Sequence, residues 1–178
     1  MEHLTTEELE SRLDEVRDAP KTDGELALIV RRPDIDEREQ LELGELSREY
    51  GLVGDSWLAR AGEDPDRDTQ LNIMNARFTA MIAGSDERWQ LAGDQLYLDL
   101  DISVDNLPVG SRVAIGDAVV EVTAVPHTGC QKFSARFGLD ARRFANSEVG
   151  RSLRLRGMNA RVVTPGPIRR GDPVRKLS

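Results

Sequence analysis

The sequence predicts a mainly β fold, a closed or half-open β-barrel with a few short helices and a helix at the N-terminus. Three observations support this fold class. Many short apolar segments are joined by turns rich in glycine, proline and aspartate. Residues 94–104 alternate apolar and polar side chains almost strictly, which is typical of a half-buried strand. Long helical segments between the strands are lacking, so a parallel βαβ architecture is disfavoured.

Length and composition set further limits. A chain of 178 residues forms one domain of ordinary size and is too short for a (β/α)₈ barrel. No apolar run reaches the roughly 18 residues of a transmembrane helix, and the N-terminus lacks the pattern of a secretory signal peptide. One cysteine and two histidines exclude an internal disulfide framework and a zinc site with two or more cysteines. We therefore expect a cytoplasmic protein without a membrane partner.

The first element is a helix over residues 5–18. Thr5 and Glu8 have the spacing of a capping box, with Thr5 as the N-cap. One face repeats apolar residues at helical spacing, namely Leu9, Leu13 and Val16. Because its other faces are acidic, we expect this helix to pack outside the barrel or against a second copy of the chain, and not over an anion site.

Short strands follow along the chain. The apolar run 25–32 suits a buried strand, and residues 40–46 partly alternate. Residues 71–82 are ambiguous and are interpreted as a strand followed by a helical turn. Gly116 and Asp117 lie between two apolar runs and indicate a tight hairpin. Further expectations are a short helix at 139–146, strands at 161–163 and Val174, and a series of turns over 165–173.

Charge is unevenly distributed. The net charge is −8 and the pI is near 4.9, which argues against nucleic-acid binding. Residues 129–178 nevertheless carry 12 basic and 3 acidic residues. Either this part pairs with acidic side chains elsewhere in the fold, or it forms a local anion site. For the second case we expect one concave surface to gather two or more of Arg136, Arg142, Arg143 and Arg161.

The most informative stretch for chemistry is residues 126–138, which holds the single thiol. Cys130 lies close in sequence to His127 and Lys132, with Arg136 four positions beyond the lysine. Nearby cations lower the pKa of a thiol, and a thiolate can ligate a soft metal, carry sulfur or act as a nucleophile. The alternative is a small buried cysteine among ordinary surface charges. The spacing predicts a partly accessible thiol in a pocket beside a cation.

Several short motifs, taken in their order along the chain, resemble the MOSC domain, the module found at the C-terminus of molybdenum cofactor sulfurases. The central one is Gly116-Asp117, an apolar strand, Cys130-x-Lys132 and then Ser-Ala-Arg-Phe-Gly at 134–138. Other matching stretches are residues 26–33, 51–57, 107–110, 157–163 and 171–173. The resemblance covers roughly residues 25–176. It divides the chain into an N-terminal helical extension, 1–24, and a MOSC-like β-barrel domain, 25–178.

The resemblance implies an antiparallel barrel and a molybdenum cofactor (molybdopterin), a pterin with a dithiolene and a terminal phosphate. Cys130 matches the family cysteine that carries sulfur or ligates molybdenum, so it is the expected catalytic residue and metal ligand. Some members reduce N-hydroxylated compounds with electrons from a redox partner, so a molybdenum-dependent oxidoreductase or a sulfur-transfer protein with a sulfur-donor partner is expected. The expected cofactor-binding residues are Lys132, Arg136, Arg142, Arg143, Thr128 and Asn75.

One segment departs from the family pattern. Residues 58–70 lack the His-Gly-Gly sequence that many catalytic members carry. Asn72, Asn75 and Arg77 either replace the missing polar groups or cap secondary structure. The departure favours a non-catalytic binding module for a small anionic ligand or a partner protein, whereas the intact Cys130 motif favours a cofactor site. A thiol enzyme without metal is a third hypothesis.

Overall fold

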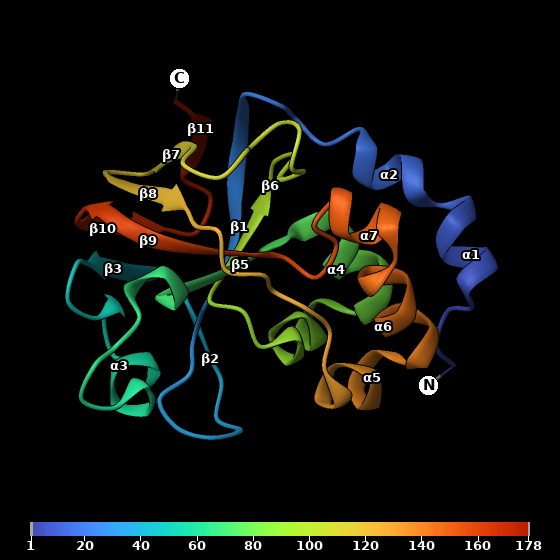
Figure 1. Cartoon of the computed structure of the whole chain (residues 1–178), viewed down its shortest axis with the longest axis horizontal. Coiled ribbons are helices and arrows are strands. Elements are labelled where there is room, and N and C mark those ends of the chain that lie inside the picture. Colours follow the sequence, from blue (N-terminus) through green and yellow to red (C-terminus); the bar gives the residue numbers. More distant parts are fainter. Residues whose placement is uncertain (1, 178) are drawn as a thin grey trace.

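The computed structural model describes residues 2–177 and shows a barrel with helices against one side of it (Figure 1). The barrel strands are β1 (Asp23–Arg31), β5 (Leu71–Asn75), β6 (Leu96–Asp99), β7 (Arg112–Ile115), β8 (Ala118–Val122), β9 (Met158–Thr164) and β11 (Pro173–Lys176). Within residues 2–177 these seven strands follow the order β11-β7-β8-β9-β5-β6-β1, and β1 pairs with β11 to close the ring. The predicted barrel is therefore confirmed.

Most neighbouring strands run antiparallel, but β5 and β6 run parallel. Their connection contains α4 (Ala76–Ala83) and the 3-10 helix η2 (Asp86–Ala92), so the barrel includes one βαβ crossover among its described strands. β2 (Glu39–Leu41) pairs with the C-terminal end of β1, residues 29–31. A separate small sheet has the strand order β10-β3-β4, formed by β3 (Leu43–Ser47), β4 (Gly51–Leu52) and β10 (Gly166–Arg169).

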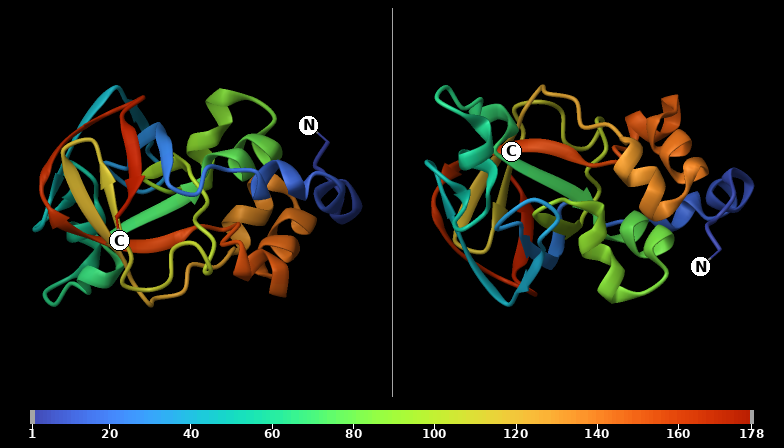
Figure 2. Two further views of the ribbon diagram at one scale, coloured as in Figure 1. Left: turned by 90° about the horizontal axis from the view of Figure 1, so that it is seen from above. Right: turned by 90° about the horizontal axis from the view of Figure 1, so that it is seen from below.

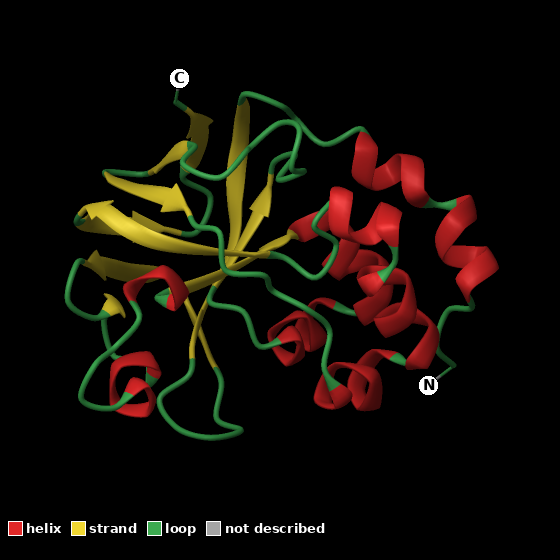
Figure 3. Ribbon diagram, in the orientation of Figure 1, coloured by secondary structure: helices red, strands yellow, loops and turns green. Residues whose placement is uncertain are grey.

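Helices gather on one side of the barrel, as Figure 3 and both views of Figure 2 show. They include α1 (Thr6–Ser11), α2 (Leu13–Arg17), α5 (Gln131–Phe137), α6 (Leu139–Asn146) and α7 (Glu148–Ser152), together with α4 and η2. On the other side, near β3, lie α3 (Trp57–Ala61) and the 3-10 helix η1 (Arg67–Thr69). No helix within residues 2–177 is both long and apolar enough to cross a membrane.

The protein has two hydrophobic cores, one inside the barrel and one in the helical layer, and strands β1 and β6 contribute side chains to both. In β6, Leu96 and Leu98 face the barrel core, whereas Tyr97 belongs to the core of the helical layer. All three side chains are fully buried. β1 behaves in the same way, with Ile29 in the barrel core and Val30 in the helical core. The helical layer is therefore attached to the barrel by strands that are buried on both faces.

The structure corrects several expected elements. Strand β6 covers only part of residues 94–104, and Tyr97 on its second face is buried under the helices instead of exposed to solvent. The turns expected over 165–173 include the strand β10, which pairs with β3. The short helices expected beside the barrel are present. The hairpin at Gly116-Asp117 and the helix at 139–146 are confirmed.

The expected N-terminal helix forms as two short helices that meet at Arg12. The Thr5–Glu8 capping box is present in full. The apolar stripe is buried in the helical core, where α1 contacts α6 and α2 contacts α4. The backbone N–H of Thr6 donates to a carboxylate oxygen of Asp140 at 3.0 Å. The stripe therefore packs on the helical layer and does not cover the thiol.

This packing predicts a large effect of Leu9→Ala on stability. Leu9 is fully buried between helices, so we expect the substitution to lower the free energy of unfolding by about 2–5 kcal/mol. Leu43→Ala is the matched control, because Leu43 is 55% exposed and should change stability by less than about 0.5 kcal/mol. Urea unfolding measures both. Equal effects of the two substitutions would contradict the docking of α1.

Candidate functional site

The loop between β8 and α5 carries the single thiol from the barrel to the helical layer. Two asparagine side chains hold its backbone. The amide of Asn159 donates to the carbonyl of Val125 at 3.0 Å. Asn146 exchanges two hydrogen bonds with Gly129, one from each residue, at 2.8 and 3.0 Å. Cys130 follows in extended conformation, immediately before α5, and its side chain is exposed.

A buried carboxylate lies beneath this loop. Asp94 precedes β6, and its side chain is fully buried. One carboxylate oxygen accepts from Nη1 of Arg156 at 2.6 Å, and the other lies 3.0 Å from Nε2 of His127. Arg156 also donates from Nη2 to the carbonyl of Ala92, and its guanidinium lies 5.0 Å from the centre of the Phe133 ring. One cluster thus joins three separate segments of the chain.

The protonation states of this cluster follow from burial and charge. Burial raises the pKa of Asp94, but Arg156 and His127 together lower it by more than burial raises it. The pKa of Asp94 is therefore below its usual range. Burial and the charge of Arg156 lower the pKa of His127 more than Asp94 raises it. His127 is therefore neutral at pH 7. Because a carboxylate only accepts, Nε2 carries the hydrogen and Nδ1 keeps a free lone pair.

Cys130 lines a cavity of about 420 Å³, called here the thiol pocket. Among the described residues, its lining contains the acidic side chains of Asp34 and Asp36. Six basic side chains also line it, namely Arg32, Arg38, Arg60, Lys132, Arg136 and Arg156. Cations therefore outnumber anions at its surface, on a protein whose net charge is negative.

The cations of the thiol pocket differ in how they are neutralised. Arg32 forms a two-pronged ion pair with the buried Asp55, at 2.9 and 2.8 Å. Arg38 and Arg60 form no ion pair with any described residue, and burial lowers the pKa of both guanidinium groups. Nε of Arg38 and Nε of Arg156 are buried without a hydrogen-bond partner in the described chain. The pocket therefore retains unused donors and positive charge.

The pKa of the Cys130 thiol is lowered. Partial burial raises it, but the backbone N–H groups of Phe133 and Lys132 and the charge of Arg156 outweigh that effect. A larger fraction of Cys130 is therefore thiolate at neutral pH than for a cysteine in an unfolded chain.

Only some of the residues singled out in the sequence meet at this pocket. Lys132 and Arg136 line it with Cys130, and both approach Asp36, at 3.5 and 3.4 Å. Thr128 lies in a neighbouring cavity. Asn75 accepts hydrogen bonds from the first N–H groups of α4 and therefore caps that helix.

The other arginines from the basic part of the chain lie elsewhere. Arg142 packs beside Gly129 without lining the thiol pocket. Arg143 lines a shallow groove next to α1. Arg161 forms ion pairs with Asp68 and Glu121 at 3.2 and 2.6 Å. Of the four arginines expected around one concave surface, the structure brings Arg136 alone to the thiol pocket.

Several residues of the site were missed in the sequence. Arg32, Arg38 and Arg60 come from the acidic half of the chain, where charge balance gave no reason to select them. Asn72 does line the pocket, and its side-chain oxygen accepts from Arg32 at 3.3 Å. The sequence did contain one signal for Asp94. It is a charged residue in phase with the apolar positions 96, 98 and 100 of the alternating segment, where a core residue would be expected.

The fold and the site define a closed barrel protein with an exposed thiol, its pKa lowered by its surroundings, at the edge of a cationic pocket. The family model of the MOSC domain matches residues 70–175, which is more than half of the sequence. The chain therefore belongs to the MOSC domain family, and the resemblance inferred from its motifs is confirmed.

Similar solved structures share the fold at low sequence identity. The YUAD protein from Bacillus subtilis has a TM-score of 0.60 and 15% identity, covering 88% of this chain and 97% of that chain. YiiM from Escherichia coli has a TM-score of 0.56 and 19% identity, covering 86% and 70%. YiiM from Geobacillus stearothermophilus has a TM-score of 0.58 and 16% identity, covering 87% and 75%. No curated protein sequence matches this chain.

We expect Cys130 to react with iodoacetamide in the folded protein. The labelling rate should reach half its maximum at a lower pH than in urea, because the folded structure lowers the pKa of the thiol. Mass spectrometry at a series of pH values follows both reactions. A thiol that reacts only after unfolding would show that Cys130 is an ordinary buried cysteine.

The buried cluster predicts that Asp94→Asn lowers the free energy of unfolding by about 3–5 kcal/mol, because it leaves the charge of Arg156 buried without a carboxylate. Asp99→Asn makes the same chemical change in the Asp99–Arg77 pair. That pair is about one-third exposed, with side-chain exposures of 33% and 37%, and the effect should stay below about 1 kcal/mol. Denaturant titration compares the two variants, and similar losses would count against a structural role of the cluster.

Proposed function

We propose that the thiol pocket binds a molybdenum cofactor, with the Cys130 thiolate as the protein's ligand to the metal. The observation that carries this proposal is the position of a thiol, its pKa lowered by its surroundings, in a pocket with excess positive charge. Membership of the MOSC family supports the choice of cofactor. A thiolate suits a soft metal that already has dithiolene sulfur ligands.

The residues of the pocket fit such a group. No cluster of three or more metal-binding side chains exists within residues 2–177, so the remaining metal ligands would come from the cofactor. The terminal phosphate needs cationic donors, and Arg38 and Arg60 have no carboxylate partner in the described chain. The partnerless Nε atoms of Arg38 and Arg156 are the buried donors that an anion would satisfy.

Each residue has a distinct task in this proposal. Arg38 and Arg60, with Lys132, hold the phosphate, and Cys130 binds the metal. A bound molybdenum cofactor supplies a redox-active metal for oxygen-atom or electron transfer. His127, neutral and fixed through Nε2, can accept a proton at Nδ1 from a substrate in the pocket. Reduction of N-hydroxylated compounds, with electrons from a redox partner protein, is the reaction class that we propose for this site.

Sulfur transfer is a second candidate function, favoured by the exposure of Cys130 at the protein surface. In this reaction the Cys130 thiolate attacks the outer sulfur of a persulfide on a donor protein. A new S–S bond forms on Cys130 as the donor's own thiolate leaves, so no external oxidant is needed. The absence of a His-Gly-Gly sequence from residues 58–70 favours instead a non-catalytic binding module for a small anionic ligand or a partner protein.

Elemental analysis distinguishes these functions. The protein is purified from a host that makes molybdenum cofactor, beside a molybdoenzyme that verifies cofactor supply. We expect about one molybdenum per chain, loss of the metal in Cys130→Ser, and at least fivefold lower occupancy in Arg60→Gln. Arg143→Gln, which removes the same charge outside the pocket, should retain the metal.

Two outcomes would overturn the cofactor proposal. One is absence of molybdenum while the reference enzyme is loaded, and the other is full occupancy in Cys130→Ser. Cyanide-labile sulfur in the metal-free protein, lost in Cys130→Ser, would then establish sulfur transfer.

A further inference from the structure

We propose that a second cavity, separated from the thiol pocket by His127 and Arg156, binds a small apolar carboxylate. This cavity has a volume of about 490 Å³ and lies between the barrel and the segment that joins α7 to β9. His127 and Arg156 line both cavities. The inference does not depend on the cofactor, because the side chain expected to bind the carboxylate, Arg151, lines only the second cavity.

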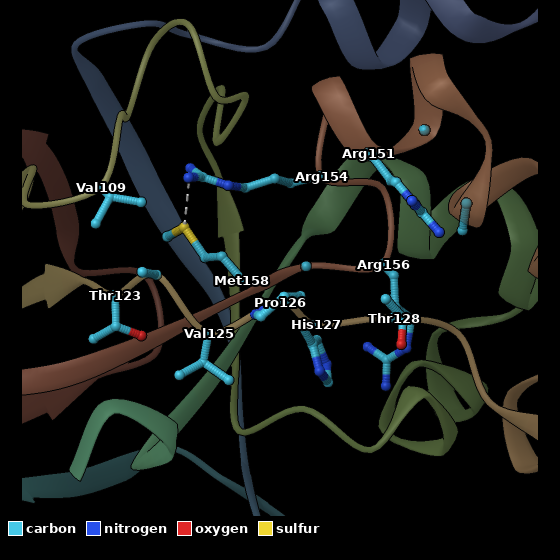
Figure 4. Close-up of a pocket in the computed structure, with 14 residues that line it drawn as sticks. Val109, Thr123, Val125, Pro126, His127, Thr128, Arg151, Arg154, Arg156 and Met158 are labelled. Carbon is cyan, nitrogen blue, oxygen red and sulfur yellow. Dashed lines mark hydrogen bonds between the residues drawn. The ribbon is translucent and has the colours of Figure 1, made fainter. Parts of the chain in front are cut away.

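The walls of the second cavity are amphipathic. Figure 4 shows Val109 and Val125 on one side, and Arg151, Arg156 and Thr128 on the other. Met158 and Ala145 add further apolar surface. Val109 is 59% exposed, which leaves an apolar side chain at the cavity uncovered by the described protein. An apolar cavity with a few polar groups at one end is the usual form of a binding site for an organic ligand.

The charge in this cavity is positive and incompletely neutralised. Its described lining contains no aspartate or glutamate. Arg156 is paired with Asp94, which lies behind the wall. Arg154 donates from Nη1 to the carbonyls of Ile102 and Leu107, and it forms no ion pair with any described residue. Arg151 is exposed, and its side chain makes no hydrogen bond or ion pair with the described chain.

The segment that supplies the arginines is held in an unusual conformation. Arg154 has a φ of 50°, which is uncommon for a residue with a side chain. Gly157 has a φ of 103°, and a Cβ atom there would lie 2.4 Å from the carbonyl oxygen of Ile73. Leu155, between them, is fully buried. The conformation of Arg154 costs energy and persists only where the surroundings fix it, and such residues are concentrated at ligand sites.

These features select one class of ligand. The unpaired guanidinium of Arg151 matches the two oxygens of a carboxylate. The apolar wall opposite disfavours strongly hydrated ligands such as sugars or polyphosphates, because their polar groups would lose water without gaining partners. A single negative charge at one end of a flat or branched hydrocarbon satisfies both walls at once.

The test uses 2-naphthoate as the probe and 2-naphthamide as its uncharged control. Calorimetric titration of the full chain should show one saturable site for naphthoate with a Kd below about 1 mM. We expect Arg151→Gln to weaken binding about fivefold or more, and Arg143→Gln, an exposed arginine outside the cavity, to leave it unchanged. Val109→Asp should weaken it similarly by placing a negative charge at the cavity.

Nuclear magnetic resonance locates the probe. Amide shifts should change for Thr123, Val125 and Gly157 of the second cavity, more than for Lys132 and Arg136 of the thiol pocket. The proposal is overturned if naphthoate does not saturate, if Arg151→Gln binds it as tightly as the parent protein, or if naphthamide binds equally well. It is also overturned if the shifts centre on the thiol pocket.

Discussion

The buried carboxylate of Asp94 fixes the geometry on which both cavities depend. It has no contact with solvent, so its charge is tolerated only while Arg156 and His127 stay bonded to it. Those partners come from segments 62 and 33 residues away in sequence. The start of β6, the thiol loop and the segment before β9 are therefore held together by one ionic cluster. His127 and Arg156 of this cluster form the common wall of the two cavities.

A second constraint places the thiol at the boundary between the barrel and the helices. The middle strands bury both faces, and their outer face carries side chains such as Tyr97 and Val30 into the helical core. Phe133 of α5 belongs to the same core. Because α5 is anchored there while its preceding loop leaves the barrel, Cys130 lies where the two parts meet. The thiol is exposed although Gly129 before it is hydrogen-bonded to Asn146 and Phe133 after it is buried, which is the usual arrangement for a functional loop on a packed scaffold.

Local patterns in the sequence predicted local structure well. The Thr5–Glu8 capping box and the Gly116-Asp117 hairpin depend on residues a few positions apart, and both are present. The burial of Tyr97 in β6 was not predicted because alternation reports one buried face and cannot show that helices cover the other. The lining arginines of the thiol pocket were missed for a related reason. Arg32 and Arg156 lie far apart in sequence, and only the closed barrel brings them to one cavity. Much of the basic charge of residues 129–178 is used in ion pairs such as Arg161 with Asp68 and Arg175 with Asp23.

The pairing that closes the barrel has a consequence for the order of folding. Residues 23–25 of β1 pair with residues 173–175 of β11, so this contact spans about 150 positions along the chain. Such distant contacts are entropically costly and form slowly. During synthesis the ring cannot close until residues 173–176 have left the ribosome, and until then one edge of β1 lacks its partner at these positions. The helical layer, whose α4 to α7 can pack earlier, covers the outer face of the strands in the meantime but leaves this edge of β1 unpaired.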